Sequence, residues 1–505
     1  MKYIFNEDLN KGIVDRILQL NSVTKVDIDV SNFKVDYNLD IINSFKEKLL
    51  SYKDKKFLIV GDYDCDGICS TTIIKKLFDD IGIANNYYIP SRTKEGYGLN
   101  DKIVHNAYDN GFDCMFLLDN GIVAKQQLQL ANDLGLKVFI IDHHEYQEDP
   151  LCVSFLHPNI FPKEYRDMCA GGLSALFANS FKEDDFFTAL GGLATVADMV
   201  DIFNYNRYLA LKAQKIIADG KIEPINYLLN GVEASFTNIE FNVIPKINAV
   251  SRLDDLLNVN YVVRFLLSSG QECHEYYFKI ENINDTRKNY SRIMYEQALT
   301  MIDETSKVIV IKSDSFKVGL CGLVANRLLE AFKKPVLVFC EDGKTLNGSG
   351  RSIPGVNLYE YLKGAETLFE AYGGHELAVG ITLKTGNFDS LMSYIESHDL
   401  NYEEPYEDVL VVDQNYINDE VLNEIDSLEP YGTNFKLPLF ALHNPRILSR
   451  TMAGGKFPKY DLSKSLYAIS FKTKLDDSDF EYMIGRFKKD KYYSNKLNLV
   501  IEDLV

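Results

Sequence analysis

Residues 57–67, FLIVGDYDCDG, decide the fold of this chain. Four apolar residues followed by a Gly/Asp turn are typical of a strand that is buried on both faces, and the helical apolar period then continues over 68–78. Two more apolar runs, 115–118 and 137–141, lie on either side of a helical pattern at 126–134. Strands and helices that alternate in this way predict an α/β fold with a parallel, doubly wound sheet.

Carboxylates follow each of these three predicted strands. The first strand runs into the turn 61–67, the second ends at 119–121 (DNG), and the third ends at 142–144 (DHH). Because the carboxyl ends of parallel strands share one edge of a sheet, we expect these side chains to meet at one place. A further aspartate, Asp198, follows another apolar run.

The ligand types of this acidic cluster predict which metal it binds. So many carboxylates repel one another unless cations neutralise them. Oxygen and imidazole ligands without thiolates favour Mn²⁺ or Mg²⁺ over structural zinc, and the eight cysteines contain no CxxC pair. Two such ions a few ångströms apart clamp an in-line displacement at phosphorus. The cluster therefore predicts hydrolysis of a phosphodiester or a phosphoanhydride.

The overall composition is that of a globular protein with an acidic balance. The chain has 505 residues, enough for about three domains, and a formal net charge of −19. This charge disfavours a nucleic-acid partner, although part of it belongs to the cluster that binds cations, and a net charge does not describe a local potential. No run approaches the roughly 18 apolar residues of a spanning helix. The first eight residues turn acidic before a signal-peptide core can form, so we expect a cytoplasmic protein without a membrane partner.

The rest of the chain divides into segments with different patterns of predicted helices and strands. A long helical stretch near 207–229 is expected to bridge to a second domain. Strand patterns at 308–311 and 336–339 then surround a helical pattern at 323–332, which predicts another α/β domain. The last hundred residues change to short strands and turns that end at 497–501, as in a small β-barrel.

Taken in order, the motifs resemble the DHH phosphoesterase superfamily. The segments 61–67, 119–121 and 142–144 are similar to its motifs I to III, and Asp198 matches motif IV. Within the superfamily, the chain most resembles the RecJ family of single-strand-specific 5′→3′ DNA exonucleases. Further segments resemble RecJ signatures: 92–99, 247–253, 348–352, 373–375, 428–432 and 499–503.

This resemblance implies a domain order. A parallel-sheet DHH catalytic domain would occupy 1–205, and a connecting helical region 206–300. A second α/β domain, called DHHA1, would occupy 301–400 and be joined to the first by a long helix. An OB-fold β-barrel would occupy 401–505.

The resemblance also assigns roles to single residues. It implies two divalent ions, Mn²⁺ or Mg²⁺, with Asp119 between them, held by Asp62, Asp64, Asp66, Asp119, His143 and Asp198. His144 would face the scissile phosphate and complete the catalytic set Asp64, Asp66, Asp119, His143, His144 and Asp198. The substrate would be bound by Arg92, Ser349 and Arg351 at the 5′-terminal phosphate, by Tyr97 through base stacking, and by Asn248, Arg252 and His375 along the strand, the last two near the cleavage point.

The chain departs from the RecJ pattern outside the metal motifs. The usual Gly-Pro-Arg-Ile-Asn-Ala reads IPKINA at 244–249, and Ser251 replaces the Gly before the motif's Arg. Phe316 and Lys317 replace a Trp-His pair, and the Asn-Pro-rich end of the OB motif is reduced at 433–438. The chain is therefore expected to be a divergent member with an intact metal site.

The leading interpretation is a metal-dependent exonuclease that degrades single-stranded DNA 5′→3′ to mononucleotides in DNA repair and recombination. A single-strand-binding protein and a helicase are its candidate partners. One alternative keeps DHH chemistry: a phosphodiesterase of short oligonucleotides or cyclic dinucleotides, or a pyrophosphatase. Another is a catalytically silent DNA-binding scaffold, although such relatives usually lose metal ligands that this chain keeps.

Overall fold

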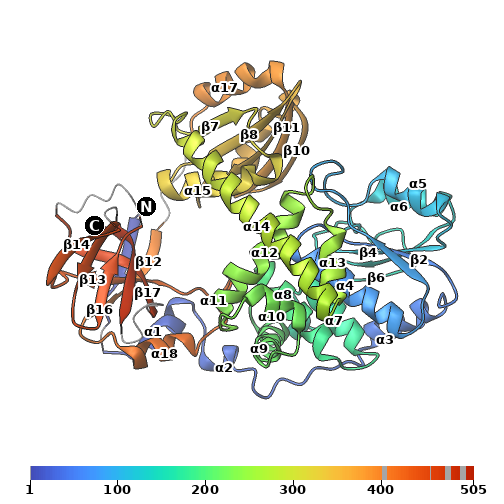
Figure 1. Cartoon of the computed structure of the whole chain (residues 1–505), viewed down its shortest axis with the longest axis horizontal. Coiled ribbons are helices and arrows are strands. Elements are labelled where there is room, and N and C mark those ends of the chain that lie inside the picture. Colours follow the sequence, from blue (N-terminus) through green and yellow to red (C-terminus); the bar gives the residue numbers. More distant parts are fainter. Residues whose placement is uncertain (1, 9, 401–405, 455–456, 472–478, 490–495) are drawn as a thin grey trace. The chain divides into compact units, whose positions relative to one another are not determined.

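The computed structural model describes the whole chain except residues 1, 9, 401–405, 455–456, 472–478 and 490–495. It forms two compact units, and Figure 1 labels many of their elements. Unit 1 comprises Met1–Asp27, Met294–Phe316 and Cys321–Val505. Unit 2 comprises Ile28–Ile293 and Lys317–Leu320. None of the described helices is long and apolar enough to cross a membrane.

Unit 2 contains the parallel sheet that the sequence predicts. Its five strands are hydrogen-bonded in the order β3-β2-β4-β5-β6, and every pair is parallel. The strands are β2 (Phe57–Val60), β3 (Asn85–Tyr88), β4 (Cys114–Leu118), β5 (Lys137–Ile141) and β6 (Ser154–Leu156). Chain order and spatial order differ at β2, so the carboxyl ends of β2 and β4 lie side by side at the switch point where such sheets bind ligands.

Helices cover both faces of this sheet, which explains why its strands are apolar without alternation. Leu58 and Leu117 pack into one cluster with residues of α5 and α6. On the other face, the Phe116 ring makes edge contacts with Phe45 of α3 and Phe78 of α4. The α-helices that lie wholly in unit 2, with one π-helical turn, are α3 (Asp40–Leu50), α4 (Cys65–Asp80), α5 (Asp101–Asp109), α6 (Lys125–Asp133), α7 (Ala170–Asn179), α8 (Asp185–Ala197), α9 (Asn204–Ala218), α10 (Glu223–Leu229), α11 (Phe236–Asn238), the π-helical turn (Ile239–Val243), α12 (Ile244–Arg252) and α13 (Asn260–Leu267).

The long helix is not where the sequence pattern placed it. The stretch 207–229 forms two helices, because Gly220 turns the chain out of α9 with a φ of +73° and Pro224 lies in the first turn of α10. The long helix is instead α14 (Gly270–Leu299), which is 30 residues long and leads into the next sheet. The predicted position was wrong, although the predicted connection exists.

A mixed sheet in unit 1 follows α14. Its order is β10-β11-β9-β8-β7, with β7 and β8 parallel and the other pairs antiparallel. The strands are β7 (Ile309–Ser313), β8 (Val336–Asp342), β9 (Thr345–Arg351), β10 (Phe369–His375) and β11 (Ala378–Lys384). The accompanying helices are α15 (Cys321–Phe332), α16 (Leu358–Lys363) and α17 (Phe388–Ser397).

The last sheet is open rather than closed. Its order is β1-β12-β13-β17-β18-β16-β15-β14, and in the described part of the chain no pairing joins β14 back to β1. The sequence predicted a closed β-barrel, and the structure corrects this prediction. The outer edge of β12 is occupied by β1 and not by a strand that would close a barrel. The strands are β1 (Lys2–Asn6), β12 (Tyr406–Val412), β13 (Leu439–His443), β14 (Ser449–Ala453), β15 (Phe457–Asp461), β16 (Leu466–Ile469), β17 (Tyr482–Lys489) and β18 (Leu497–Leu504), with helices α1 (Ile13–Leu20) and α18 (Asp419–Asp426).

The first residues pair with this last sheet, whereas the sequence division placed them in the first domain, 1–205. β1 runs parallel to β12, with Lys2 opposite Tyr406. The buried guanidinium of Arg16 on α1 donates to the carbonyls of Asn6 at 2.7 Å and Val411 at 2.8 Å. These bonds join both strands to α1. The predicted boundary between the DHHA1 domain and the OB-fold domain, at 400/401, borders residues 401–405, which lie outside the described residues.

We predict that Arg16→Ala destabilises the β1–β12 edge of this sheet by about 3 kcal/mol, since hydrogen bonds from a charged donor contribute about 1.5–3 kcal/mol each. Native-state hydrogen exchange of the β12 amides measures this. Lys11→Ala is the matched control, because Lys11 is exposed and bonds Gln19 at the surface. Equal exchange rates in the two variants would contradict the role given to Arg16.

Candidate metal centre

The turn after β2 folds back closely against the start of α4. A Cβ on Gly67 would lie 2.5 Å from the backbone oxygen of Asp62, so only glycine fits there. This close approach buries Asp62, which is 3% exposed, at the edge of the sheet. Asp64 caps α4, and its carboxylate accepts from the backbone N–H of Asp66 at 3.0 Å and of Gly67 at 3.2 Å.

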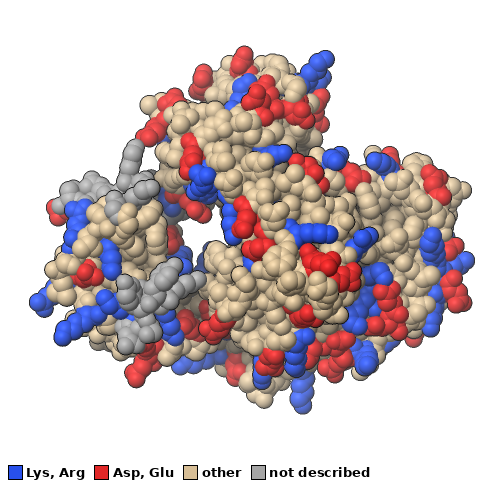
Figure 2. All heavy atoms as spheres, in the orientation of Figure 1, with Lys and Arg blue, Asp and Glu red and all other residues tan. Residues whose placement is uncertain are grey.

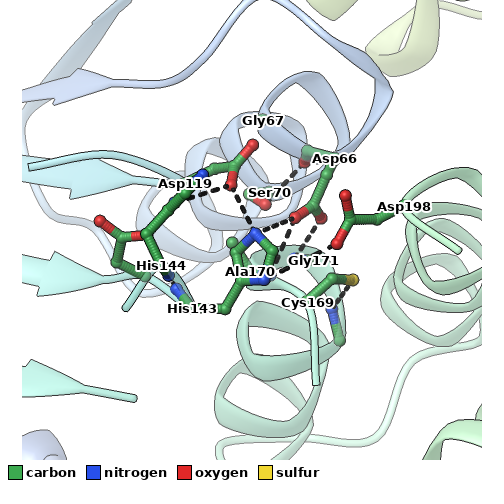
Figure 3. A network of polar contacts seen from close by, with 12 residues as sticks. Asp66, Gly67, Ser70, Asp119, His143, His144, Cys169, Ala170, Gly171 and Asp198 are labelled. Atoms are coloured by element: carbon green, nitrogen blue, oxygen red, sulfur yellow. Dashed lines mark hydrogen bonds and ion pairs between the residues drawn. The ribbon is translucent and has the colours of Figure 1, made fainter. Parts of the chain in front are cut away.

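Asp66 points from the first turn of α4 to the start of α7. Its two carboxylate oxygens accept from the backbone N–H groups of Ala170 at 2.9 Å and Gly171 at 2.6 Å. These donors belong to a helix N-terminus, which favours negative charge. Figure 3 shows Asp66 with Asp198 on one side and His143 and Asp119 on the other.

Asp119 reaches the same place from β4 through a left-handed backbone conformation. Its φ is +59°, and its N–H donates to the carbonyl of Ile141 on β5 at 2.9 Å. The residue is 3% exposed. Its Oδ1 lies 3.2 Å from Nε2 of His143, yet within the described residues it forms no hydrogen bond. A left-handed backbone conformation at a residue other than glycine, together with a buried oxygen that has no hydrogen bond, is typical of a functional site.

The DHH segment after β5 gives its three side chains different positions. Asp142 accepts from the backbone N–H of His143 at 2.8 Å and of His144 at 3.2 Å, and from Nδ1 of His144 at 2.7 Å. Its other oxygen accepts from the N–H of Ile122 at 3.0 Å. Asp142 therefore orients His144, a role that the sequence analysis did not assign. Asp142 belongs to the DHH motif, so the sequence marked it as a candidate functional residue. Only its hydrogen bonds show that it orients His144, whereas the neighbouring acids are placed to bind metal.

Three groups of side chains are close enough to hold a metal ion. In each group, one ligand atom from every residue lies within 4.8 Å of the others. The groups are Asp62, Asp64 and Asp119; Asp66, His143 and Asp198; and Asp119, His143 and His144. Asp119 and His143 each belong to two groups, which suits ions that lie near each other. All six predicted metal ligands are thus brought together.

The electrostatics of the cluster fit cations. Burial and then the neighbouring Asp64 raise the pKa of Asp66 to about 7, and burial and then Asp66 raise the pKa of Asp198 to about 8. Burial followed by neighbouring carboxylates also raises the pKa of Asp62 and of Asp119. Asp62 Oδ1 and Asp119 Oδ1 are buried without a hydrogen bond in the described part of the chain. Divalent ions would satisfy both oxygens and remove the repulsion.

Two of the predicted strand-binding residues lie beside this centre. The Tyr97 hydroxyl is 3.0 Å from Nε2 of His144 and donates to the carbonyl of Asp119 at 3.1 Å. The sequence assigned Tyr97 to base stacking and missed this contact with His144. Arg92 places its guanidinium carbon 4.8 Å from the centre of the Tyr63 ring, within the motif I turn. Asn248 and Arg252 lie on α12, where Asn248 Oδ1 is buried without a hydrogen bond among the described residues.

The remaining predicted residues lie at one end of the mixed sheet in unit 1. Ser349 and Arg351 are on β9, and His375 ends β10. Arg351 and His375 both pair with Ala378 of β11, from its two sides. Arg351 Nη1 also donates to the carbonyl of Gly350 at 2.7 Å. The strand register therefore groups these residues at one edge of their own sheet.

Three protein-family models match the chain in order. They are the DHH family N-terminal domain at residues 56–196, the DHHA1 domain at 305–398 and the RecJ OB domain at 410–503. Together they match more than half of the chain and include every predicted motif residue except Asp198, Asn248 and Arg252.

The chain belongs to the RecJ family.

This RecJ-family chain is similar to curated bacterial and prophage proteins. It is 29% identical over 404 residues to the single-stranded-DNA-specific exonuclease RecJ of Bacillus subtilis (strain 168), covering 75% of this chain and 51% of that protein, about half its length. It is 26% identical over 464 residues to the RecJ of Escherichia coli (strain K12), covering 83% and 79%. It is 26% identical over 535 residues to a putative prophage-derived single-strand DNA-specific exonuclease, YorK, of B. subtilis, covering 97% and 88%.

Solved RecJ structures have the same fold. The structure of Thermus thermophilus RecJ in complex with Mn²⁺ matches with a TM-score of 0.81 at 22% identity, covering 98% of this chain and 76% of that one. A structure of exonuclease RecJ bound to manganese matches with a TM-score of 0.62 at 25% identity, covering 72% and 94%. The likeness to the Thermus structure establishes the fold of this RecJ-family chain over nearly its whole length.

The raised carboxyl pKa values predict how metal binding depends on pH. Asp66 and Asp198 keep their protons in the metal-free folded protein up to a pH of about 7 to 8, whereas in the unfolded chain they lose them near 3.8. Stability of the metal-free protein therefore falls as pH rises between these values. A free Mn²⁺ concentration of a hundred times the Kd adds about 2.7 kcal/mol per site to the free energy of unfolding. We expect a larger Mn²⁺-induced rise in Tm at pH 8 than at pH 6, measured by scanning calorimetry. An equal rise at both pH values would contradict this electrostatic account.

Proposed function

We propose that this chain is a divalent-metal-dependent exonuclease that hydrolyses single-stranded DNA 5′→3′ to mononucleotides. The observation that carries the proposal is the meeting of Asp66, Asp119, His143 and Asp198 at the carboxyl edge of a buried parallel sheet. The names of the curated relatives, single-stranded-DNA-specific exonucleases, support the substrate. The DHHA1 and RecJ OB domains support a strand longer than a dinucleotide.

Two ions, Mn²⁺ or Mg²⁺, would be held by the six ligands, with Asp119 shared between them. Bound there, they would supply positive charge at the phosphate and Lewis acidity toward water. The residues around them have separate tasks. Asp66 is fixed by the N-terminus of α7 and so holds its ligand oxygens in place. The pKa of His143 is lowered to about 4, by burial first and then by the charge of His144, which keeps its imidazole neutral and able to act as a ligand.

His144 would act on the scissile phosphate as a positioned cation. Burial lowers its pKa, but the hydrogen bond and charge of Asp142, with the charge of Asp198, outweigh burial and raise it overall. The Asp142 bond at 2.7 Å also fixes the ring, and the Tyr97 hydroxyl lies 3.0 Å from its Nε2 and 3.2 Å from its Nδ1. A held imidazolium can donate a hydrogen bond to a phosphate oxygen, which stabilises negative charge as it develops.

The strand itself would be bound through its backbone. Arg92 with Ser349 and Arg351 would bind the 5′-terminal phosphate, because guanidinium groups fork onto phosphate oxygens. Tyr97 would stack on a base, and Asn248, Arg252 and His375 would contact the backbone. Contacts of these kinds do not read base edges, so cleavage would not depend on sequence. Figure 2 shows Lys and Arg interspersed with Asp and Glu on the visible face, so the net charge of −19 is not a uniform negative surface there.

Within the cell, we place this activity in DNA repair and recombination in the cytoplasm, with a single-strand-binding protein and a helicase as partners. A phosphodiesterase of short oligonucleotides or cyclic dinucleotides and a silent DNA-binding scaffold are the alternatives to be tested against it. The complete ligand set weighs against the scaffold, since a scaffold has no use for buried carboxylates that repel one another.

We predict that this chain degrades a 5′-phosphorylated single strand with Mn²⁺ or Mg²⁺ and releases the 5′ label first. Asp119→Ala should lower kcat by at least about a hundredfold. Even the loss of a residue that only hydrogen-bonds a metal ligand lowers metal affinity or activity about 10–100-fold. End-labelled single- and double-stranded DNA, with 5′ and 3′ labels compared, gives the direction and the strand preference.

Three outcomes would overturn the proposal. Release of the 3′ label first reverses the direction, and turnover of dinucleotides but not of a long strand supports the phosphodiesterase. Strand binding without metal-dependent turnover supports the scaffold. Lys94→Ala serves as the control, since Lys94 neighbours the Arg92 loop residues but has no assigned role.

A further inference from the structure

The loop that carries Arg92 is bound on both sides by a single carboxylate. Asp254 Oδ2 accepts from the Ser91 hydroxyl at 2.6 Å and from the Thr93 N–H at 3.1 Å. Its Oδ1 accepts from the Thr93 hydroxyl at 2.5 Å. These bonds enclose Arg92 from the residue before it and the residue after it. Asp254 itself lies two residues beyond Arg252, just after the end of α12.

The loop also closes on itself. Glu95 accepts from the Tyr88 hydroxyl at 2.7 Å and from the Ser91 N–H at 2.9 Å. The N–H groups of Glu95 and Gly96 donate to the carbonyl of Ser91 at 2.9 and 3.2 Å. The loop is thus a compact turn that Asp254 joins to the turn after α12, while Asn260 at the start of α13 exchanges two hydrogen bonds with the backbone of Ile89, just before the loop, at 2.9 and 3.1 Å.

The other side of the Asp254 turn is fixed as well. The next residue, Asp255, pairs with Lys317 at 2.8 Å. Arg252 Nη1 donates to the carbonyl of Gly319 at 3.4 Å, and a Cβ on Gly319 would lie 2.1 Å from the Arg252 carbonyl oxygen. The end of α12 is therefore packed against 317–320, which makes it a rigid base for the bonds of Asp254.

Arg92 lies beside the motif I turn. Its guanidinium carbon is 4.8 Å from the centre of the Tyr63 ring, and Tyr63 stands between the predicted metal ligands Asp62 and Asp64. Arg252 reaches the same attachment from α12, two residues before Asp254. Asp254 therefore joins the loop of one predicted strand-binding arginine to the helix end that carries the other.

We propose that Asp254 is a positioning residue that sets the spacing between Arg92 and Arg252, so that both guanidinium groups bind one strand. The inference rests on the proposed function, because it places two of the proposed strand-binding residues. Asp254 does not bind the strand itself, since a carboxylate repels phosphate. It holds the Arg92 loop in its binding conformation before the strand arrives, which removes an ordering cost from binding.

Limited digestion with trypsin tests the loop without any nuclease activity. Trypsin cleaves after Arg92 and Lys94, and both bonds lie in the loop that Asp254 holds. We expect Asp254→Ala to speed cleavage at these two bonds about tenfold, because local opening exposes them. Asp109→Ala is the matched control and should leave that rate unchanged, because Asp109 is exposed at the end of α5 and takes no part in these bonds. An unchanged rate in Asp254→Ala would overturn the proposal.

Kinetics on a 5′-phosphorylated single strand test the consequence for binding. Asp254→Ala should raise KM about tenfold with kcat within twofold, and in Arg92→Ala the further change Asp254→Ala should add little. If the two effects multiply, Asp254 does not act through Arg92 and the proposal is wrong. Thr93→Val, which removes only one of the three bonds, gives a milder effect in the same direction if Asp254→Ala fails to fold. If the wild type shows no hydrolysis, the proposed function fails, while the trypsin result still decides whether Asp254 holds the loop.

Discussion

Repulsion among the buried carboxylates at the carboxyl edge of the parallel sheet governs the rest of this structure. The protein offsets part of it with backbone donors, since Ala170 and Gly171 at the start of α7 satisfy Asp66. The offset is incomplete, because Asp62 Oδ1 and Asp119 Oδ1 are buried without a hydrogen bond among the described residues. A cluster that costs stability and is left unsatisfied is a binding site for cations.

The strands and the acidic cluster follow from local sequence. The strands β2 and β5 have the bounds that the sequence predicts, because the strand residues buried on both faces of the sheet are apolar, and the one polar residue, Lys137, is the exposed first residue of β5. The edge at which Asp66, Asp119 and His143 meet needed only the rule that parallel strands end together. Chain segments far apart were thus placed correctly without any knowledge of their contacts.

What the sequence could not give depends on contacts between distant segments. Nothing in the five residues of β1 identifies β12 as its partner. The position of the long helix depended on the left-handed conformation of Gly220, which the pattern of apolar residues does not reveal. The roles of Asp142 and Asp254 are similar cases. An aspartate that accepts hydrogen bonds and one that binds a metal look the same in a sequence, and only their partners distinguish them.

The number of Mn²⁺ ions bound per chain tests the central claim most directly. Equilibrium dialysis of the full chain against Mn²⁺, with free ion measured by electron paramagnetic resonance, gives this number without requiring activity. The account predicts two ions for the wild type and fewer than two for Asp119→Asn, because Asp119 belongs to two ligand groups. No bound Mn²⁺, or the same number in wild type and Asp119→Asn, would contradict it.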